Sequence, residues 1–323
     1  MRFGHHGRMD VLVKPRLDQA KFRDPRLTAK GEVRATVGLR QLDTLWLNTG
    51  TLCNLSCNGC YIESSPRNDR LAYLTRGEVR TYLAEIAAER LPTSLIGFTG
   101  GEPFMNPELI GMLEDVLSSG LHALVLTNAM LPMRKLQAPL RALHRSYGNR
   151  LKIRVSLDHY TPDGHESERG ARSWQPTIDG LVWLAENGFA IDVAGRKLTA
   201  EPEESLRAGY GRLFNALGVP VDAFDPVRLM LFPEMDPVSD VPEITTACWG
   251  ILHKSPDDVM CASARMVVKR RGADAPAVVA CTLVPYDTGF EMGRTLKEAS
   301  GSVALNHPYC ASFCVLGGAA CSR

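Results

Sequence analysis

Three cysteines lie within eight residues of the sequence, in the stretch TLCNLSCNGCYIES at positions 51–64. They are Cys53, Cys57 and Cys60, so the spacing is Cys-x3-Cys-x2-Cys. A closed structural zinc site needs four ligands. Three thiolates can instead hold three irons of a cubane iron–sulfur cluster and leave the fourth iron open. The loop therefore predicts a metal centre at which a substrate or cofactor binds directly.

The composition limits where this chemistry takes place. The chain has 323 residues, of which 45% are hydrophobic and 23% charged, as in ordinary globular proteins. Lys and Arg number 37 against 36 for Asp and Glu, which argues against nucleic acid as the main partner. The sequence has no apolar run approaching the roughly 18 residues of a membrane helix, and no signal-peptide core. We expect a cytoplasmic protein, whose nine cysteines serve metal binding or catalysis rather than disulfides.

Short apolar runs alternate with amphipathic segments over residues 42–235. Their length and their Val, Ile, Leu and Phe content are typical of strands buried on both faces. The predicted strands are 43–48, 94–99, 122–127, 151–158, 189–194 and 227–232. This βα alternation predicts a parallel sheet, either a partial (β/α)6 barrel of the TIM type or an open doubly wound sheet.

Helical spacing of apolar residues fills the gaps between these strands. The first helix is expected within 75–91 with Thr75 as its N-cap, and the second begins near Asn106-Pro107 and ends at Gly120. Further helices fit 135–147, 174–187 and 203–217. In such folds ligands collect at the carboxyl ends of the strands.

Residues suited to chemistry follow the predicted strands at that rim. The cysteine loop follows the first strand and the motif TGGEP (99–103) the second. Thr127 and Asn128 follow the third strand, where they are either turn residues or cofactor contacts. Ser156 and Asp158 end the fourth. After the fifth strand, Arg196 and Lys197 are either solvated charges or a site for an anionic substrate group.

The cysteine spacing together with GGEP resembles the radical S-adenosylmethionine (SAM) enzymes, over roughly residues 42–232. The resemblance implies a [4Fe–4S] cluster on Cys53, Cys57 and Cys60, with SAM bound to the open iron. Such enzymes cleave SAM reductively to a 5′-deoxyadenosyl radical, which removes a hydrogen atom from the substrate. The resemblance also implies a low-potential electron donor of the flavodoxin or ferredoxin type.

The same resemblance assigns roles to residues of the rim. It implies that Gly100, Gly101 and Glu102 receive the SAM amino group, since glycines let backbone carbonyls approach an ammonium closely. Ser156 and Asp158 resemble ribose or carboxylate contacts. Arg169 resembles the arginine that pairs with the SAM carboxylate.

One position departs from the family pattern. The family usually carries an aromatic residue just before the third cysteine, where this chain has Gly59. The expected contact with the adenine ring is then lost or is made by Tyr61, which follows Cys60.

The last 83 residues hold six of the nine cysteines. The segment 261–281 is predicted to form a β-hairpin that brings Cys261 and Cys281 to one end, and 288–300 is predicted to be helical from its middle. With Cys310 and Cys314, this arrangement resembles the single-cluster auxiliary extension of radical SAM enzymes, the twitch form of the SPASM-type domain. The implied ligands are these four cysteines, with Cys321 as a substitute for Cys314. A zinc site with four cysteines is the alternative.

The sequence thus predicts an N-terminal extension (1–41), a radical SAM partial barrel (42–235) and a cysteine-rich α+β auxiliary domain (236–323). The expected reaction oxidises or rearranges a peptide or small molecule. Cys248 and Cys321 are left over; each is either inert or a catalytic hydrogen donor or acid. Two alternatives remain, an iron–sulfur electron-transfer protein and a zinc-stapled binding protein, both without SAM chemistry.

Overall fold

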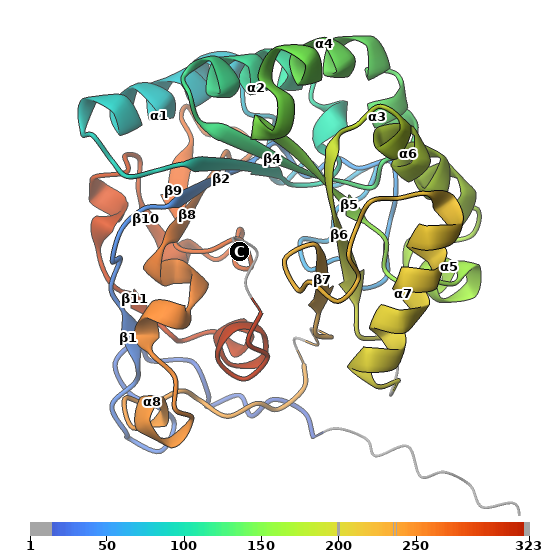
Figure 1. The fold of residues 1–323 in the computed structure, drawn as a ribbon. Helices are drawn as coiled ribbons and strands as arrows, with labels where there is room; N and C mark the ends of the chain where they lie inside the picture. The colour runs from blue at the N-terminus through green and yellow to red at the C-terminus, as the bar shows by residue number, and fades with distance from the viewer. Residues whose placement is uncertain (1–14, 199–200, 235, 237, 320–323) are drawn as a thin grey trace, which may run out of the picture.

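The computed structural model describes residues 15–198, 201–234, 236 and 238–319 (Figure 1). A curved sheet forms its centre, and helices cover the convex outer face of this sheet. The reddest, C-terminal segment lies on the concave side. In the part of the chain that the structure describes, no helix has the length and apolar character needed to cross a membrane.

All six predicted strands of the βα region are present. They are β2 (Thr44–Asn48), β3 (Leu95–Thr99), β4 (His122–Thr127), β5 (Leu151–Ser156), β6 (Ala190–Arg196) and β7 (Leu229–Phe232). They pair in parallel, each with the next along the chain, in the order β2-β3-β4-β5-β6-β7. A doubly wound sheet would reverse its order at a switch point. The unreversed order confirms the partial barrel.

The helices largely follow the prediction. They are α1 (Arg76–Ala88), α2 (Leu109–Ser118), α3 (Leu131–Arg134), α4 (Gln137–Tyr147), α5 (Pro162–Arg169), α6 (Trp174–Glu186) and α7 (Glu203–Leu217). Thr75 is the N-cap of α1, in a capping box with Glu78. Helix α2 begins later than predicted, because residues after GGEP first form a 3-10 turn (Pro103–Met105). The sequence patterns did not predict α5.

The C-terminal region continues the barrel sheet. The predicted hairpin forms from β8 (Ala264–Val268) and β9 (Ala277–Val279), which pair antiparallel. Strand β8 also pairs in parallel with β2, so the sheet passes without a break from the barrel into the cysteine-rich region. The proposed boundary at 235/236 therefore separates two regions of one sheet.

The helix predicted from the middle of 288–300 is wrong. Residues Glu291–Gly293 form β10, which pairs with β9, and a single 3-10 turn (Glu298–Ser300) follows. Gly293 has φ 125°, which a helix excludes. The backbone of this segment instead forms hydrogen bonds with the neighbouring strand β9. The other C-terminal elements are α8 (Cys248–Ile251), β11 (Val303–Ala304) and a π-helical segment (Cys310–Val315).

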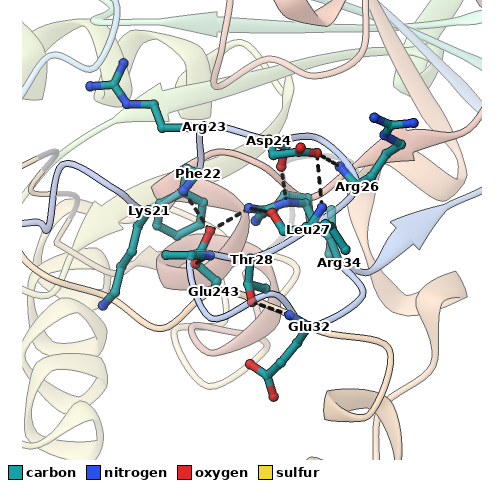
Figure 2. Close-up of polar contacts among 12 residues, drawn as sticks. Lys21, Phe22, Arg23, Asp24, Arg26, Leu27, Thr28, Glu32, Arg34 and Glu243 are labelled. Atoms are coloured by element: carbon teal, nitrogen blue, oxygen red, sulfur yellow. Dashed lines mark hydrogen bonds and ion pairs between the residues drawn. The ribbon is translucent and has the colours of Figure 1, made fainter.

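The segment before the barrel packs on the C-terminal region. Strand β1 (Thr36–Val37) pairs with β11, and Arg34 forms an ion pair of 2.5 Å with Glu243 (Figure 2). The Arg34 side chain is fully buried and also donates to the carbonyls of Asp24, Leu27 and Leu305. Burial opposes the charge of Glu243, but amide donors and Arg34 together lower the pKa of its carboxyl. We call residues 16–34 with Glu243 the N-terminal clasp.

Candidate functional site

The three-cysteine loop leaves the carboxyl end of β2 and lines a cavity of about 180 Å³. Cys53, Cys57 and Cys60 all contribute to its wall. Two backbone amides point at the sulfurs: Leu55 N–H to Cys53 Sγ at 3.4 Å and Ser64 N–H to Cys60 Sγ at 3.3 Å. Such donors stabilise thiolates. Burial raises the pKa of the Cys53 thiol to about 12, whereas coordination to a metal deprotonates a thiol.

Most residues predicted for the site reach this one cavity. Besides the three cysteines, its lining includes Tyr61, Gly100, Gly101, Thr127, Asn128, Ser156, Asp158 and Arg169. They come from the loops after β2, β3, β4 and β5 and from the end of α5. The geometry therefore brings together the cysteine loop and the polar ends of the neighbouring strands, as expected for the carboxyl edge of a parallel barrel.

A side chain at Gly100 or Gly101 would collide with neighbouring backbone. Gly100 has φ 133°, and a Cβ on it would lie 2.4 Å from the carbonyl oxygen of Gly50. A Cβ on Gly101 would lie 2.1 Å from the carbonyl oxygen of Leu52. The backbone after β3 thus packs directly against the residues that lead into Cys53, and the Gly101 amide donates to the Gly50 carbonyl at 2.8 Å. Both glycines also line the cavity, so this Gly100–Gly101 cradle offers backbone atoms to a ligand beside the cysteines.

Glu102 occupies a different place from its glycine neighbours. Its side chain is 2% exposed, lies outside the cavity lining and accepts hydrogen bonds from Thr127 Oγ1 and from the amides of Asn128 and Phe104. Burial raises the pKa of the Glu102 carboxyl to about 7, against the effect of these donors. Glu102 therefore ties the loop after β3 to the loop after β4.

Asp158 and Arg169 form an ion pair in the wall of the cavity. Arg169 Nε lies 2.8 Å from Asp158 Oδ2, and Nη2 donates to Oδ1 at 3.2 Å. Beneath them the buried His165 accepts a hydrogen bond from the Asp158 amide at its Nδ1, and burial lowers the pKa of His165 to about 4. The neutral imidazole thus fixes the backbone of Asp158.

The structure adds a side-chain pair that the strand pattern did not reveal. Arg196 lines the cavity and forms an ion pair with Glu168, and its guanidinium lies against Gly59. A Cβ on Gly59 would lie 2.0 Å from Arg196 Nη1. The glycine before Cys60 was the only sequence signal for this contact. Lys197, considered together with Arg196, instead pairs with Glu203 at the surface.

A second cavity holds the C-terminal thiols. Its lining includes Cys261, Cys281, Cys310 and Cys314 among apolar side chains such as Val259 and Phe290. Cys310 and Cys314 share one side because both lie on the π-helical segment. Burial raises the pKa of Cys261 to about 11 and that of Cys310 to about 12. Four thiols with no charged side chain in the lining form a donor set suited to iron–sulfur clusters or zinc.

The two cysteine groups lie at opposite ends of the barrel. Because β8 runs parallel to β2, Cys261, which precedes β8, lies at the amino end of these strands, whereas Cys53 follows their carboxyl end. Cys281 follows the antiparallel β9 and so lies near Cys261. Leu283 lines both cavities, which places them on either side of one side chain.

Among the described cysteines, Cys248 lines neither cavity. It packs against the apolar cluster around the second cavity, and its sulfur accepts a hydrogen bond from the Thr245 amide at 3.4 Å. Cys321 lies outside the described residues. None of the eight described cysteines forms a disulfide. Within the described ranges, no group of three or more His, Cys, Asp or Glu side chains converges on a single point.

Comparison with known proteins gives a match to one enzyme superfamily. The family model of the Radical SAM superfamily matches residues 47–208. The chain is 31% identical over 143 residues to the antilisterial bacteriocin subtilosin biosynthesis protein AlbA of Bacillus subtilis (strain 168), covering 44% of this chain and 30% of that protein. It is 30% identical over 164 residues to GTP 3′,8-cyclase of Microcystis aeruginosa, covering 47% and 46%. The chain thus spans less than half the length of these curated relatives.

Solved structures share the fold at low sequence identity. Streptococcus suis SuiB bound to S-adenosylmethionine superposes with a TM-score of 0.57 at 11% identity, over 79% of this chain and 63% of SuiB. The protein anSMEcpe with bound AdoMet gives 0.56 at 14% identity, over 79% of each chain. The matched segment contains the end of β2, the three-cysteine loop, both glycines of GGEP and strands β3 to β6. The chain belongs to the Radical SAM superfamily.

Proposed function

We propose that this protein is a radical SAM enzyme that uses two iron–sulfur clusters to oxidise or rearrange an organic substrate. Cys53, Cys57 and Cys60 would hold a [4Fe–4S] cluster with one open iron. When bound and reduced, this cluster supplies one electron that cleaves SAM into methionine and a 5′-deoxyadenosyl radical, which takes a hydrogen atom from the substrate. The observation that carries the proposal is that three thiols and the Gly100–Gly101 cradle line the same cavity.

The chain's residues would then position SAM at the edge of the barrel. The backbone of Gly100 and Gly101 lines the cavity beside Cys53 and would receive the amino group. Arg169 would take the carboxylate through the guanidinium donors that Asp158 leaves available. Ser156 and Asp158 would bind the ribose, and Tyr61, which lines the same space, would contact the adenine ring. Glu102 would act through Thr127 and Asn128, whose positions it fixes.

Cys261, Cys281, Cys310 and Cys314 would hold an auxiliary [4Fe–4S] cluster, with Cys321 as the alternative to Cys314. This assignment is supported by their common cavity and by Leu283, which lines both this cavity and the first. After loss of one hydrogen atom, net two-electron oxidation requires that the substrate lose one more electron and one proton. An auxiliary cluster on these cysteines would accept that electron, and solvent or a side chain would take the proton. A flavodoxin or ferredoxin type of protein would supply the first electron.

The alternatives differ in what they require. An electron-transfer protein has no use for the Gly100–Gly101 cradle, and redox-neutral epimerisation with Cys248 as hydrogen donor would need that thiol in the first cavity. The names of the relatives suggest two classes of substrate, a bacteriocin for AlbA and a nucleotide for the cyclase.

The proposal is tested by anaerobic incubation of the reconstituted holoenzyme with dithionite and SAM. We expect 5′-deoxyadenosine from the wild type, at least a hundredfold less from Cys57→Ala, and an unchanged amount from the matched control Cys248→Ala. No 5′-deoxyadenosine from the iron-loaded wild type would refute SAM cleavage. Equal production by Cys57→Ala would refute the assignment of the loop.

A further inference from the structure

The lining of the first cavity combines polar and apolar side chains. The polar part is the cysteine loop with the strand ends described above. The apolar part includes Leu126, Phe232, Leu283 and Phe313, which belong to one hydrophobic cluster. The rings of Phe232 and Phe313 pack at a centroid distance of 5.4 Å and an interplanar angle of 33°. The cavity therefore has an apolar and partly aromatic wall.

The two cations that line the cavity already have carboxylate partners. Arg169 pairs with Asp158, and Arg196 pairs with Glu168. Among the described residues of this lining, no further Lys or Arg is present. A triphosphate or another multiply charged group is bound in proteins by several cations or a metal ion. The described lining supplies no such surplus of positive charge.

A further group of charges lies beneath the cavity, outside its lining, where three cations share one carboxylate. Lys152, Arg154 and Arg228 all approach the buried carboxylate of Asp192, at 3.1, 3.7 and 3.3 Å. Arg154 and Asp192 are each two residues before a cavity-lining residue of their strand, Ser156 and Ala194, and so lie one layer farther along the barrel interior. None of these four residues lines the cavity.

We propose that the part of the substrate that reacts is an uncharged apolar group, an aliphatic or aromatic side chain, seated on the Phe232–Phe313 wall. This inference rests on the proposed function and specifies its substrate class. An apolar group gains contact with Leu126 and the two rings, whereas a charged group there would lose its hydration without gaining a partner. Leu283, which belongs to this wall, also lines the second thiol cavity.

The test uses hydrogen transfer as its readout. The holoenzyme is incubated with dithionite, SAM and one of six probes, and deuterium in 5′-deoxyadenosine is measured by mass spectrometry. Five probes are N-acetylated pentapeptide amides Gly-Gly-X-Gly-Gly, where X is Leu, Val, Phe, Asp or Lys with a perdeuterated side chain. The sixth probe is ribose-deuterated GTP. We expect at least tenfold more deuterium from one or more of the Leu, Val and Phe peptides than from the Asp or Lys peptides or GTP.

Variants connect that result to the wall. Phe232→Asp should reduce deuterium transfer from the apolar peptides at least tenfold. The 5′-deoxyadenosine that forms from SAM without any peptide should stay within about twofold of the wild type. Phe313→Asp should do the same, and its iron content is measured alongside because Phe313 adjoins Cys314. The matched control is Phe224→Asp, since Phe224 is 57% exposed and lies outside the cavity. This variant should show the same deuterium transfer and the same SAM cleavage as the wild type.

The outcomes separate the two proposals. Deuterium from GTP, from the charged peptides alone, or from none of the probes while SAM is still cleaved would overturn the apolar assignment and leave the proposed function standing. Unchanged transfer in both Phe→Asp variants would also overturn it. Failure to form any 5′-deoxyadenosine would instead count against the proposed function itself.

Discussion

At the scale of single residues, the least expected feature is the contact of Gly59 with Arg196. The guanidinium fills the space that a side chain at position 59 would occupy, and Glu168 holds it there. The loop around the cysteines is further fastened to α5, because the Asn58 amide donates to the Glu168 carbonyl at 2.8 Å. The glycine in the cysteine motif is thus explained by an arginine from a distant strand.

This contact predicts a non-additive pair of substitutions. Gly59→Phe should reduce SAM cleavage at least tenfold, because its ring must displace the Arg196 guanidinium and the ion pair with Glu168 opposes that shift. Adding Arg196→Ala should restore part of the lost activity, since the space is then available. Gly77→Ala, in the exposed first turn of α1, is the control and should have no effect. A double variant no better than Gly59→Phe alone would show that the steric account is wrong.

A second residue-scale prediction concerns the glycine cradle. Gly101→Ala should lower the free energy of unfolding by about 1–3 kcal/mol, because the added methyl meets the backbone of Leu52 at 2.1 Å. The same variant should bind less iron, since Leu52 precedes Cys53. Gly211→Ala, within α7, is the comparison. Its added Cβ would lie 3.7 Å from the Ala223 Cβ, an ordinary contact, so this substitution should stabilise the helix by about 0.5–1 kcal/mol. Urea unfolding and iron analysis provide the measurements, and equal effects of the two substitutions would contradict the argument.

At the scale of elements, the sequence predicted what local patterns control. The strand TLWLN (44–48) is recognisable because it is buried throughout and bounded by polar residues, and the N-cap Thr75 because its capping partner Glu78 is local. The β strand at 291–293 was missed, since its formation depends on the edge of β9, which is a tertiary partner. The pairing of Gly59 with Arg196 was missed for the same reason. The cysteines and glycines of the site were predicted because their types and spacing reflect a demand of the ligand.

The N-terminal clasp is an element whose role the sequence did not suggest. Arg34 and Glu243 are 209 residues apart in sequence, and their side chains are 0% and 6% exposed. Removing one partner of a buried ion pair leaves the other uncompensated. We therefore expect Arg34→Met to lower the free energy of unfolding by about 3–5 kcal/mol.

A surface pair of the same segment is the control for this prediction. Lys21 and Asp240 are 20% and 31% exposed at the side chain, so Lys21→Met should cost less than about 1 kcal/mol. Urea unfolding under anaerobic conditions compares the two variants. A loss below about 1 kcal/mol in Arg34→Met would show that the clasp contributes little to stability.

At the scale of the whole molecule, the barrel separates two groups of thiols. The first group lies in the loop after β2, and the second lies beyond the opposite end of that strand, behind Leu283. The thiols of the first group line the first cavity together with Leu283, which also lines the second cavity. Under the proposed function, a substrate in the first cavity would meet the radical there and would pass an electron to a cluster in the second. The continuous sheet from β7 to β10 keeps both groups in a fixed relation.

The central claim, two clusters on two separate sets of cysteines, is tested most directly by iron and sulfide analysis after anaerobic reconstitution. The wild type should contain about eight irons per chain. Replacement of Cys53, Cys57 and Cys60 by Ala should leave about four and abolish SAM cleavage, and replacement of Cys261, Cys281, Cys310 and Cys314 by Ala should leave about four and retain it. Zinc in place of iron at the second set, or loss of all iron in the loop variant, would contradict the two-cluster account.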